Sequence, residues 1–564
     1  MAETAQSPTL ETRRHQMFPV LAPVEIDRLR RFAEPRAFAD SERLVSAGEV
    51  ASAMYVILKG EAVATLYDGL INREPFVTVG PGGFTGELAQ LSSRPALVDI
   101  HAQGEVETLA IPSQRIRDLL VEEAEIGERM MRALILRRVG LIESGVGPII
   151  IGRADNADVV RLEGFLTRNG HPHLRLDDTD ECGQDLMGRF GVDPHELPVV
   201  LCPGRQLLRN PSESELARCI GMVAPIDSSK LFDVAIVGAG PAGLAAAVYA
   251  ASEGLCVLAL DCRAFGGQAG ASARIENYLG FPTGITGMAL MGRAYSQALK
   301  FGVEVAIPDE VTNVRPTEVS NEGGYTLALA NGEHIKARSV IIASGANYRR
   351  LNVDNLAAFE GSSVHYWASS VEGRLCKDQE VAIVGAGNSA GQAAVYLASQ
   401  AAKVWLILRG YSLHPSMSRY LIERIAALPN VEILAQTEVN GLEGERGALE
   451  AIRWRNRASG EETRRRIRHL FLFIGAEPNT AWLSDSGVTL DDKGFVCTGA
   501  ALGNGHDSLE TSLPGVFAIG DVRAGSIKRV AAAVGEGAQV VAALHGFLAK
   551  AAEEGTRSTI SGRA

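Results

Sequence analysis

The chain carries one seven-residue sequence twice. VAIVGAG fills residues 234–240 and returns at 381–387, and the likeness continues to a second strand-like segment, LCVLALD in the first copy and AKVWLILR in the second. Strand, glycine turn, helix and strand in this order make a βαβ unit, which binds dinucleotides at the carboxyl ends of parallel strands. The repeat therefore predicts two copies of one nucleotide-binding unit.

The first copy has the full glycine pattern of such a unit. Gly238, Gly240 and Gly243 form G-x-G-x-x-G between a strand and a helix. The first glycine permits a tight turn, the second lets the backbone approach a diphosphate, and the third allows close helix packing. Asp261 ends the next strand, where its carboxylate would accept hydrogen bonds from a ribose. Glycines alone also mark structural turns, but this combination favours a dinucleotide site.

The second copy keeps the turn and loses the acid. Its turn residues are Gly385, Gly387 and Ala390, and the position matching Asp261 is Leu408, followed by Arg409. An arginine there can pair with a 2′-phosphate through charge-assisted hydrogen bonds, so this copy is expected to prefer NADP over NAD. The alternative is that Arg409 is a solvated charge at a strand end.

Two nucleotide units with opposite ribose chemistry indicate a flavin in one and a nicotinamide in the other. GVFAIGD at 515–521 reads as a short strand ending in Asp521, ahead of an apolar helix. An acid there can bind the ribitol hydroxyls of a flavin. The amino terminus of the helix would stabilise negative charge on the reduced ring.

At this point the chain resembles the low-molecular-weight thioredoxin reductases over roughly residues 231–550. The resemblance rests on GAGPAG (238–243), GGQ (266–268), IENYLGFPTGITG (275–287), ASGA (343–346), VGAGNSA (384–390), FIGAEPNT (473–480) and GVFAIGD (515–521). It implies an FAD-binding domain in two pieces, 231–350 and 478–550, an inserted NADPH-binding domain at 351–477, and a homodimer.

The resemblance also implies which residues contact the cofactors. Those implied for FAD are Pro241 and Ala242 with the three glycines of the first turn, then Gly267, Gln268, Asn277, Asp521, Arg529 and Ala531. Those implied for NADPH are the second turn with Asn388, Ser389, Ala390, Arg409 and Gly475.

One departure from this family bears on the chemistry. The reductases have a Cys-x-x-Cys just before the second glycine motif, and here Trp367 and Ser370 stand at those positions. Serine cannot be oxidised to a disulfide, so no dithiol can form there. Cys376 follows without a partner nearby in sequence and is interpreted as a buried structural thiol. No side-chain acid or base is assigned a catalytic role, and no metal site is expected.

Residues 16–145 read as a β-roll closed by a long amphipathic helix from Arg115 to Ile142, and they resemble a cyclic-nucleotide-binding domain of the catabolite-activator type. In GFTGELAQLSSRPALVDIHA (83–102), Glu87 matches the glutamate that binds the ribose, beside backbone N–H groups from Gly86 onward. The phosphate-pairing arginine normally follows the proline, but Pro95 is followed by Ala96 and Arg94 is displaced. A cyclic nucleotide is therefore one candidate effector, and a degenerate docking or dimerisation domain is the alternative.

Residues 146–226 alternate strand-like segments with helices, one of them expected over residues 157–168, and resemble a thioredoxin-like domain without its redox pair. GRADNAD (152–158) replaces the expected dithiol, and Leu197-Pro198 stands where the family has a cis proline. Cys182 and Cys202 are far apart in sequence; they either meet in the fold or serve ordinary packing.

Residues 1–15 and the polar tail 551–564 are expected to lack regular structure. The predicted fold class is a multidomain α/β protein: an N-terminal β-roll plus helix, a thioredoxin-like α/β domain and two Rossmann-like dinucleotide-binding domains.

Charge and cysteine usage exclude some partners. Asp plus Glu number 67 against 55 Lys plus Arg, so a nucleic-acid backbone would be repelled. Seven cysteines with no Cys-x-x-Cys suit a reducing compartment, and the polar amino end shows no signal peptide, so a cytoplasmic location is expected. The uncharged run 234–252 holds glycines and a proline in its first half, which argues against a membrane span.

We therefore expect an FAD-dependent NADPH oxidoreductase that passes electrons to an acceptor other than a bound dithiol, such as ferredoxin, a quinone or oxygen. The front domains are expected to regulate it. One alternative is a thioredoxin-disulfide reductase that uses remote thiols such as Cys182 and Cys202. Another is a signalling protein whose flavin senses redox state while its N-terminal domain binds a nucleotide or a partner.

Overall fold

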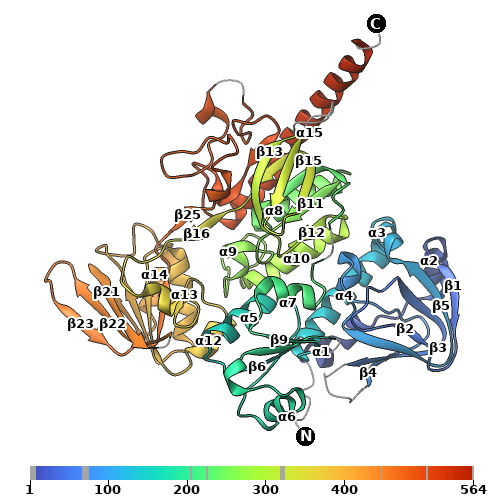
Figure 1. Ribbon diagram of the computed structural model, residues 1–564, viewed down its shortest axis with the longest axis horizontal. Helices are drawn as coiled ribbons and strands as arrows, with labels where there is room; N and C mark the ends of the chain where they lie inside the picture. Colours follow the sequence, from blue (N-terminus) through green and yellow to red (C-terminus); the bar gives the residue numbers. More distant parts are fainter. Residues whose placement is uncertain are drawn as a thin grey trace.

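The structure is a computed structural model that describes residues 8–66, 75–203, 206–223, 226–317, 324–445, 447–503 and 506–561. Along the chain come an N-terminal β-roll, a small α/β unit (residues 146–223) and two larger bodies, each built on a mainly parallel sheet (Figure 1). The first body comprises residues 226–345 and 479–561, and the second body comprises residues 351–475. In Figure 1 the small α/β unit lies below the first body, between the β-roll and the second body.

The β-roll is antiparallel, with strand order β1-β5-β3-β4 and β2 paired to β5. Alternate residues of a strand point to opposite faces, so Tyr55 and Ile57 of β3 fill the roll while Met54 and Val56 pack against the helices. The elements are α1 (Pro8–Met17), α2 (Pro23–Leu29), β1 (Glu34–Phe38), β2 (Arg43–Val45), β3 (Ala53–Leu66), β4 (Pro75–Val79), β5 (Val98–Pro112), α3 (Ser113–Glu122) and α4 (Ala124–Glu143).

Two expectations for this part were wrong. A single helix was predicted from Arg115 to Ile142, but Glu123 interrupts it, because its backbone leaves the helical region and its buried carboxylate accepts hydrogen bonds from Arg28 and Arg31. Disorder was predicted over residues 1–15, yet α1 occupies Pro8–Met17 and packs on α4. Residues 1–7 lie outside the described part of the chain.

The small α/β unit has a four-stranded sheet in the order β7-β6-β8-β9. β6 and β7 are parallel and joined through α5, whereas β8 and β9 form an antiparallel hairpin. Its elements are β6 (Ile149–Ile151), α5 (Ala157–Arg168), β7 (Leu174–Leu176), α6 (Glu181–Phe190), β8 (Val199–Leu201), β9 (Leu207–Arg209) and α7 (Glu213–Cys219). The predicted helix over 157–168 is confirmed, and the Leu197-Pro198 peptide bond is cis.

The first body has a seven-stranded sheet in the order β12-β11-β10-β15-β14-β13, with β26 beside β15. Its central strand β10 is buried on both faces, as parallel strands covered by helices are. The elements are β10 (Leu231–Val237), α8 (Pro241–Ser252), β11 (Val257–Leu260), α9 (Gly267–Gly270), α10 (Gly287–Lys300), β12 (Glu304–Ala306), β13 (Val311–Pro316), β14 (Tyr325–Leu329), β15 (His334–Ile342), β26 (Val516–Ala518) and α15 (Val530–Ser561).

The second body is inserted into the first and repeats its central unit. Its parallel sheet has the order β17-β24-β18-β19-β20, and the three strands β21-β22-β23 form a separate antiparallel sheet. The two chain crossings pair as the antiparallel strands β16 (Ala346–Tyr348) and β25 (Ala476–Pro478). The elements are α11 (Leu356–Phe359), β17 (Val364–His365), α12 (Ser370–Leu375), β18 (Glu380–Val384), α13 (Asn388–Ala398), β19 (Lys403–Ile407), α14 (Arg419–Ala426), β20 (Val431–Leu434), β21 (Thr437–Glu445), β22 (Ala448–Asn456), β23 (Glu462–Arg465) and β24 (His469–Leu472).

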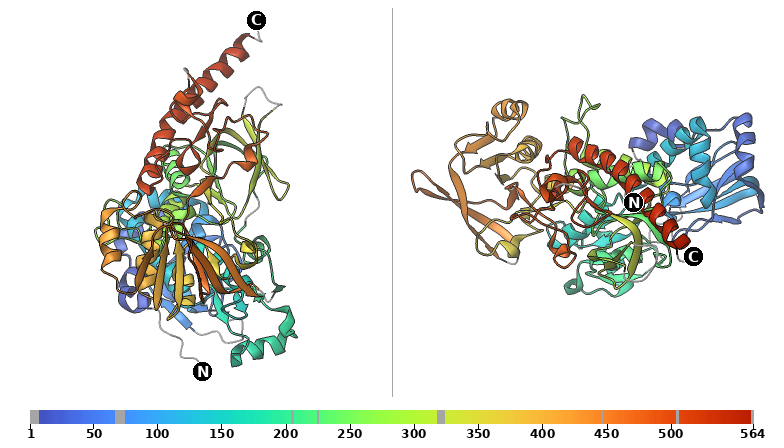
Figure 2. Two further views of the ribbon diagram at one scale, coloured as in Figure 1. Left: turned by 90° about the vertical axis from the view of Figure 1, so that its left-hand side faces the viewer. Right: turned by 90° about the horizontal axis from the view of Figure 1, so that it is seen from above.

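Helix α15 packs on α8 and then leaves the body, as Figure 1 and the left view of Figure 2 show. Gly537 permits the contact, because a Cβ there would lie 2.6 Å from the carbonyl oxygen of Ala242. The segment Val530–Ala551 is long and apolar enough to span a membrane, but Val540 and Leu544 belong to the core of the first body. The tail expected to be loose from residue 551 is instead helical as far as Ser561.

Acid should destabilise this fold, because three histidines are buried. Burial lowers the pKa of His365 to about 4 and that of its hydrogen-bonded neighbour His469 to about 3; the pKa of His171 also falls to about 3, chiefly through burial. Below their ordinary pKa of about 6.5 the unfolded chain binds more protons than the folded chain. Each histidine should then lower the free energy of unfolding by up to about 1.4 kcal/mol per pH unit as the pH falls toward 4.

Two carboxyl groups, Asp309 and Asp521, oppose this trend, because burial raises the pKa of each. Burial raises the pKa of Asp309 to about 6, so the folded chain takes up a proton there before the unfolded chain does. The three buried histidines outnumber these two carboxyls, so the unfolding temperature should fall steadily between pH 6.5 and pH 4.5, as measured by circular dichroism. A control variant at the exposed residue His334, His334→Gln, should keep the same slope. An unfolding temperature that stays level over this range would contradict the prediction.

Candidate active site

A cavity of about 1080 Å³ lies between the first and second bodies. It joins the carboxyl ends of β10 and β18, so both glycine turns open into one space. The predicted cofactor residues on its wall are Gly240, Pro241, Ala242, Asp261, Gly267, Gln268, Asn277, Gly385, Gly387, Asn388, Ser389, Arg409, Gly475, Asp521, Arg529 and Ala531. This volume is at the upper end of the range for small-molecule sites, which suits two extended ligands.

Gly238 and Gly243 do not line the cavity but shape the first turn. Gly238 has φ of +113°, and a Cβ there would lie 2.2 Å from the carbonyl oxygen of Ala343, the residue that follows the neighbouring strand β15. A Cβ on Gly243 would lie 1.8 Å from the carbonyl oxygen of Gly238. Backbone therefore occupies the space of both missing side chains, and only glycine lets α8 start this close to β10.

The amino terminus of α8 is open toward the cavity. Gly240 precedes the helix, and no side chain among the described residues caps it. Opposite stands Gly267, where a Cβ would lie 3.1 Å from the Cα of Gly240, so two glycine backbones face each other. Uncapped N–H groups at a helix start bind phosphate, and this donor set fits the diphosphate of a dinucleotide.

Two acids of the first body, Asp261 and Asp521, line the cavity. Asp261 accepts backbone N–H bonds from Ala239 at 3.0 Å and from Arg263 at 3.0 Å, which fixes its carboxylate at the end of β11. Burial raises the pKa of Asp521, and Lys528 donates to the Asp521 carbonyl oxygen at 2.5 Å. Both carboxylates keep acceptor capacity on the cavity side, which fits ribose and ribitol hydroxyls.

The second turn repeats this geometry. Gly385 has φ of +147°, and a Cβ there would lie 2.4 Å from the Phe473 carbonyl oxygen, whereas Gly387 has open space around it. Helix α13 is also uncapped by the described side chains, and Ala390 is buried behind the wall rather than on it. Arg409 is exposed at the cavity rim. This half fits a second dinucleotide with its 2′ end at Arg409.

The position of the missing dithiol is filled by a fixed aromatic side chain. Trp367 lines the cavity, and its Nε1 donates to Oε1 of Glu372 at 2.9 Å. Ser370 is the first residue of α12. Cys376, interpreted as a structural thiol, is fully buried, and burial raises its pKa to about 12.

Sequence reasoning missed the arginines of this site. Arg168 of the small α/β unit lines the cavity, as does Arg263 of the first body. Arg168 precedes the first glycine turn by 70 residues, and nothing in its local sequence marks it. Arg263 follows Asp261 by two positions, so its nearness to the ribose acid offered a weak signal.

The cysteines pair differently from the expectation. Cys202 is bonded to Cys219 at the end of α7, with Cα atoms 6.3 Å apart, and Cys182 is exposed and free. The suggested pairing of Cys182 with Cys202 is therefore wrong. Cys219 brings its sulfur to the core of the small α/β unit, because α7 packs Leu216 and Ala217 against β8.

The β-roll has a smaller cavity of about 70 Å³, lined largely by apolar side chains. Glu87 lies at its edge and pairs with Arg138 of α4 through two contacts of 3.0 Å. The carbonyl oxygen of Gly86 accepts from buried Arg137 at 2.8 Å. The glutamate expected to meet a cyclic nucleotide is thus engaged by α4, and the volume is well below the roughly 300 Å³ of small ligand sites.

Comparison with known proteins agrees with the two-body geometry. Residues 232–537 match the family described as pyridine nucleotide-disulphide oxidoreductase, and residues 35–123 match the cyclic nucleotide-binding domain. The chain is 32% identical over 312 residues to a thioredoxin reductase of Bacillus subtilis, covering 55% of this chain and 93% of that one. It is 34% identical over 310 residues to a thioredoxin reductase of Mycolicibacterium smegmatis, covering 55% and 94%.

A solved thioredoxin reductase of Lactococcus lactis is similar in structure, with a TM-score of 0.52, 28% identity and coverage of 57% of this chain and 99% of that one. The family match covers more than half of the chain, and the cavity offers the donors that two dinucleotides require. The cofactors are FAD and NADPH, and the protein is an NAD(P)H-dependent flavin oxidoreductase. The chain belongs to the pyridine nucleotide-disulphide oxidoreductase family.

Proposed function

We propose that this enzyme passes electrons from NADPH to an acceptor that is not a disulfide at residues 367–370. The observation that carries the proposal is the environment of Trp367. Its indole is hydrogen-bonded to Glu372 and contacts the guanidinium groups of Arg168 and Arg263, so the dithiol position is a fixed aromatic wall. No two of the seven cysteines are spaced as Cys-x-x-Cys.

The chain's own residues hold and orient the two cofactors. The first turn, with Gly240, Gly267 and Asp521, would hold FAD, and the second turn, with Asn388 and Arg409, would hold NADPH. Asn388 is itself fixed, because its Oδ1 accepts from the Ser418 N–H at 2.7 Å. A bound flavin can accept a hydride and then pass its electrons to an acceptor. The protein contributes alignment of the two rings and exclusion of water.

The remaining assignments follow from this one. We assign FAD binding to 231–350 and 478–550, NADPH binding to 351–477, a nucleotide-binding-like β-roll to 16–145 and a thioredoxin-like unit to 146–226. The parallel β6-α5-β7 unit followed by the β8-β9 hairpin supports the last of these. The enzyme is proposed to be a cytoplasmic homodimer whose activity the β-roll regulates.

The test is anaerobic mixing of the purified enzyme with NADPH, followed by separate additions of thioredoxin, ferredoxin, a benzoquinone and oxygen. Loss of the flavin absorbance near 450 nm, about the wavelength of oxidised flavins, would report the first half-reaction. We expect rapid reoxidation by ferredoxin, quinone or oxygen and no turnover with thioredoxin. Repeating each assay with cyclic AMP and cyclic GMP tests regulation; unchanged rates would argue against a nucleotide effector.

One observation favours a second candidate function, that of a thioredoxin-disulfide reductase. The Cys202–Cys219 disulfide gives the chain a redox-active group outside the cavity, as a thioredoxin-disulfide reductase with remote thiols would need. Thioredoxin turnover that stops in Cys202→Ser and persists in the matched Cys182→Ser variant would favour this function. Slow reoxidation by every acceptor would instead favour a redox-sensing role.

A further inference from the structure

Three parts of the chain meet at the indole of Trp367. The guanidinium carbon of Arg168, the last residue of α5, lies 5.4 Å from the ring centroid, and that of Arg263 lies 5.5 Å from it. Arg168 comes from the small α/β unit, Arg263 from the first body and Trp367 from the second. Arginine over an aromatic face is favourable, and more so away from water. The small α/β unit is therefore part of the cavity wall.

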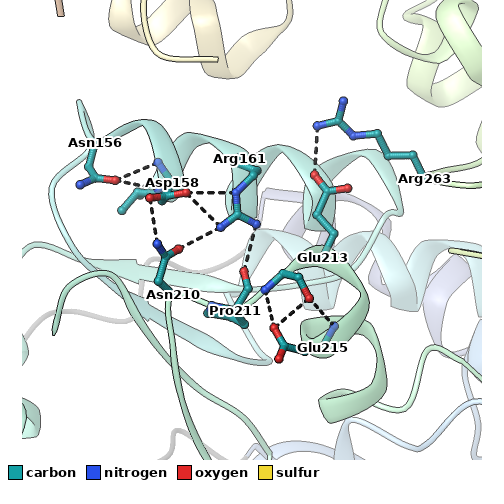
Figure 3. A network of polar contacts seen from close by, with 10 residues as sticks. Asn156, Asp158, Arg161, Asn210, Pro211, Glu213, Glu215 and Arg263 are labelled. Carbon is teal, nitrogen blue, oxygen red and sulfur yellow. Dashed lines mark hydrogen bonds and ion pairs between the residues drawn. The ribbon is translucent and has the colours of Figure 1, made fainter. Parts of the chain in front are cut away.

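The end of α5 that carries Arg168 is fixed to the first body. The next residue, Asn169, is buried, and its Nδ2 donates to the Arg263 carbonyl oxygen at 3.0 Å. Arg263 in turn donates from Nη2 to Glu213, the first residue of α7, at 3.0 Å (Figure 3). The end of α5 and the start of α7 thus both form hydrogen bonds with Arg263 of the first body.

The same two helices are also fixed to each other. Arg161 in the middle of α5 donates to Asn210 at 2.9 Å and to the carbonyl oxygen of Pro211 at 3.0 Å, just before α7 begins (Figure 3). Asp158 holds the guanidinium of Arg161 from the other side at 3.1 Å. Arg168 is therefore the last residue of a helix, α5, that is held by hydrogen bonds to the segment before α7.

The charge at this point of the wall is unbalanced. Arg263 has Glu213 as its partner, whereas no carboxylate in the described part of the chain lies within ion-pair distance of Arg168. Among the described residues, the guanidinium of Arg168 donates to one acceptor, the carbonyl oxygen of Gly267, at 3.3 Å. Burial and the nearby charge of Arg263 lower the pKa of Arg168. A partly buried cation without an anion, facing a cavity, is a site for an anionic ligand group.

Gly267, whose carbonyl oxygen accepts a hydrogen bond from Arg168, indicates which anionic group of a ligand would bind there. The Gly267 backbone faces Gly240 across the open amino terminus of α8, where a diphosphate fits. We propose that Arg168 is a cofactor-binding residue contributed by the small α/β unit, which pairs with the FAD diphosphate while holding Trp367 in place. Residue 168 lies outside the matched family region 232–537. The proposal depends on FAD binding in the first body and not on the identity of the acceptor.

The test is titration of FAD into the flavin-free full-length chain, followed by quenching of flavin fluorescence. Arg168→Met keeps an unbranched apolar stem and removes the charged guanidinium group, and should raise the Kd for FAD about tenfold or more. Arg168→Lys keeps the charge without the planar fork and should give an intermediate Kd. The control is Arg153→Met, an exposed arginine just before α5, which should bind like the wild type.

A second measurement, the KM for NADPH, shows whether Arg168 binds the diphosphate of FAD or that of NADPH. The KM for NADPH of flavin-loaded Arg168→Met should stay within about twofold of the wild type, because its diphosphate binds at α13. An unchanged Kd for FAD, or an effect confined to the NADPH KM, would overturn the proposal. If Arg168→Met loses its native circular dichroism, Arg168→Lys decides: a wild-type Kd overturns the proposal and a raised one supports it. A wild-type chain that cannot bind FAD would overturn the proposed function as well.

Discussion

Gly243→Ala is expected to yield a protein that has lost its flavin, with FAD content below about one tenth of the wild type. The added Cβ would lie 1.8 Å from the Gly238 carbonyl oxygen, which is backbone and cannot rotate away. The start of α8 must then shift, and with it the N–H groups that face the diphosphate. Overpacking of this kind costs about 1–3 kcal/mol or more in a rigid core.

A matched substitution controls for the effect of alanine itself. Gly292 lies in α10 of the same body, and nothing stands within 4 Å of the Cβ that an alanine would add. Gly292→Ala should therefore purify with its full flavin content, measured by absorbance after denaturation. If Gly243→Ala carries as much FAD as Gly292→Ala, the turn does not position the flavin as described.

Arg409→Gln is expected to erase the preference for NADPH. The guanidinium stands at the rim of the second half of the cavity, one position after Leu408, the residue that matches the acid Asp261 of the first half. Loss of charge-assisted hydrogen bonds to the 2′-phosphate costs about 1.5–3 kcal/mol, which corresponds to a rise of about 10- to 150-fold in the KM for NADPH. The KM for NADH should change by less than about twofold, since NADH lacks that phosphate.

Steady-state kinetics with both nucleotides on one preparation measures this shift. Arg419→Gln is the control, because Arg419 is also exposed on the second body but pairs with Glu423 on α14. That variant should keep the wild-type ratio of the two KM values. A proportional loss with NADPH and NADH in Arg409→Gln would show that Arg409 binds something common to both, or only supports the fold.

The two halves of the site were predictable to different degrees. The glycine turns could be predicted from the local sequence. At Gly238 and Gly385 the positive φ and the nearby backbone atoms leave room for glycine alone. Helix α5 was also predictable from its cap at Asn156 and its apolar spacing. Each of these features is complete within about 30 residues of sequence.

The cationic side of the site was not predictable in the same way. Arg168, Arg263 and Trp367 come together only when the small α/β unit packs against both bodies, and single arginines carry no signal of such a contact. The break at Glu123 has the same origin, since the arginines that hold its carboxylate lie more than 90 residues away. The pairing of Cys202 with Cys219 likewise depends on how α7 packs on β8.

The late position of β26 has a consequence for synthesis on the ribosome. β15 ends at residue 342, but the strand that completes its edge begins only at residue 516, and the helix that covers α8 begins at residue 530. The whole second body is translated in between. A nascent chain therefore exposes the unfinished edge of the first body's sheet until residues 516–518 have been translated, and α8 stays uncovered until α15 follows.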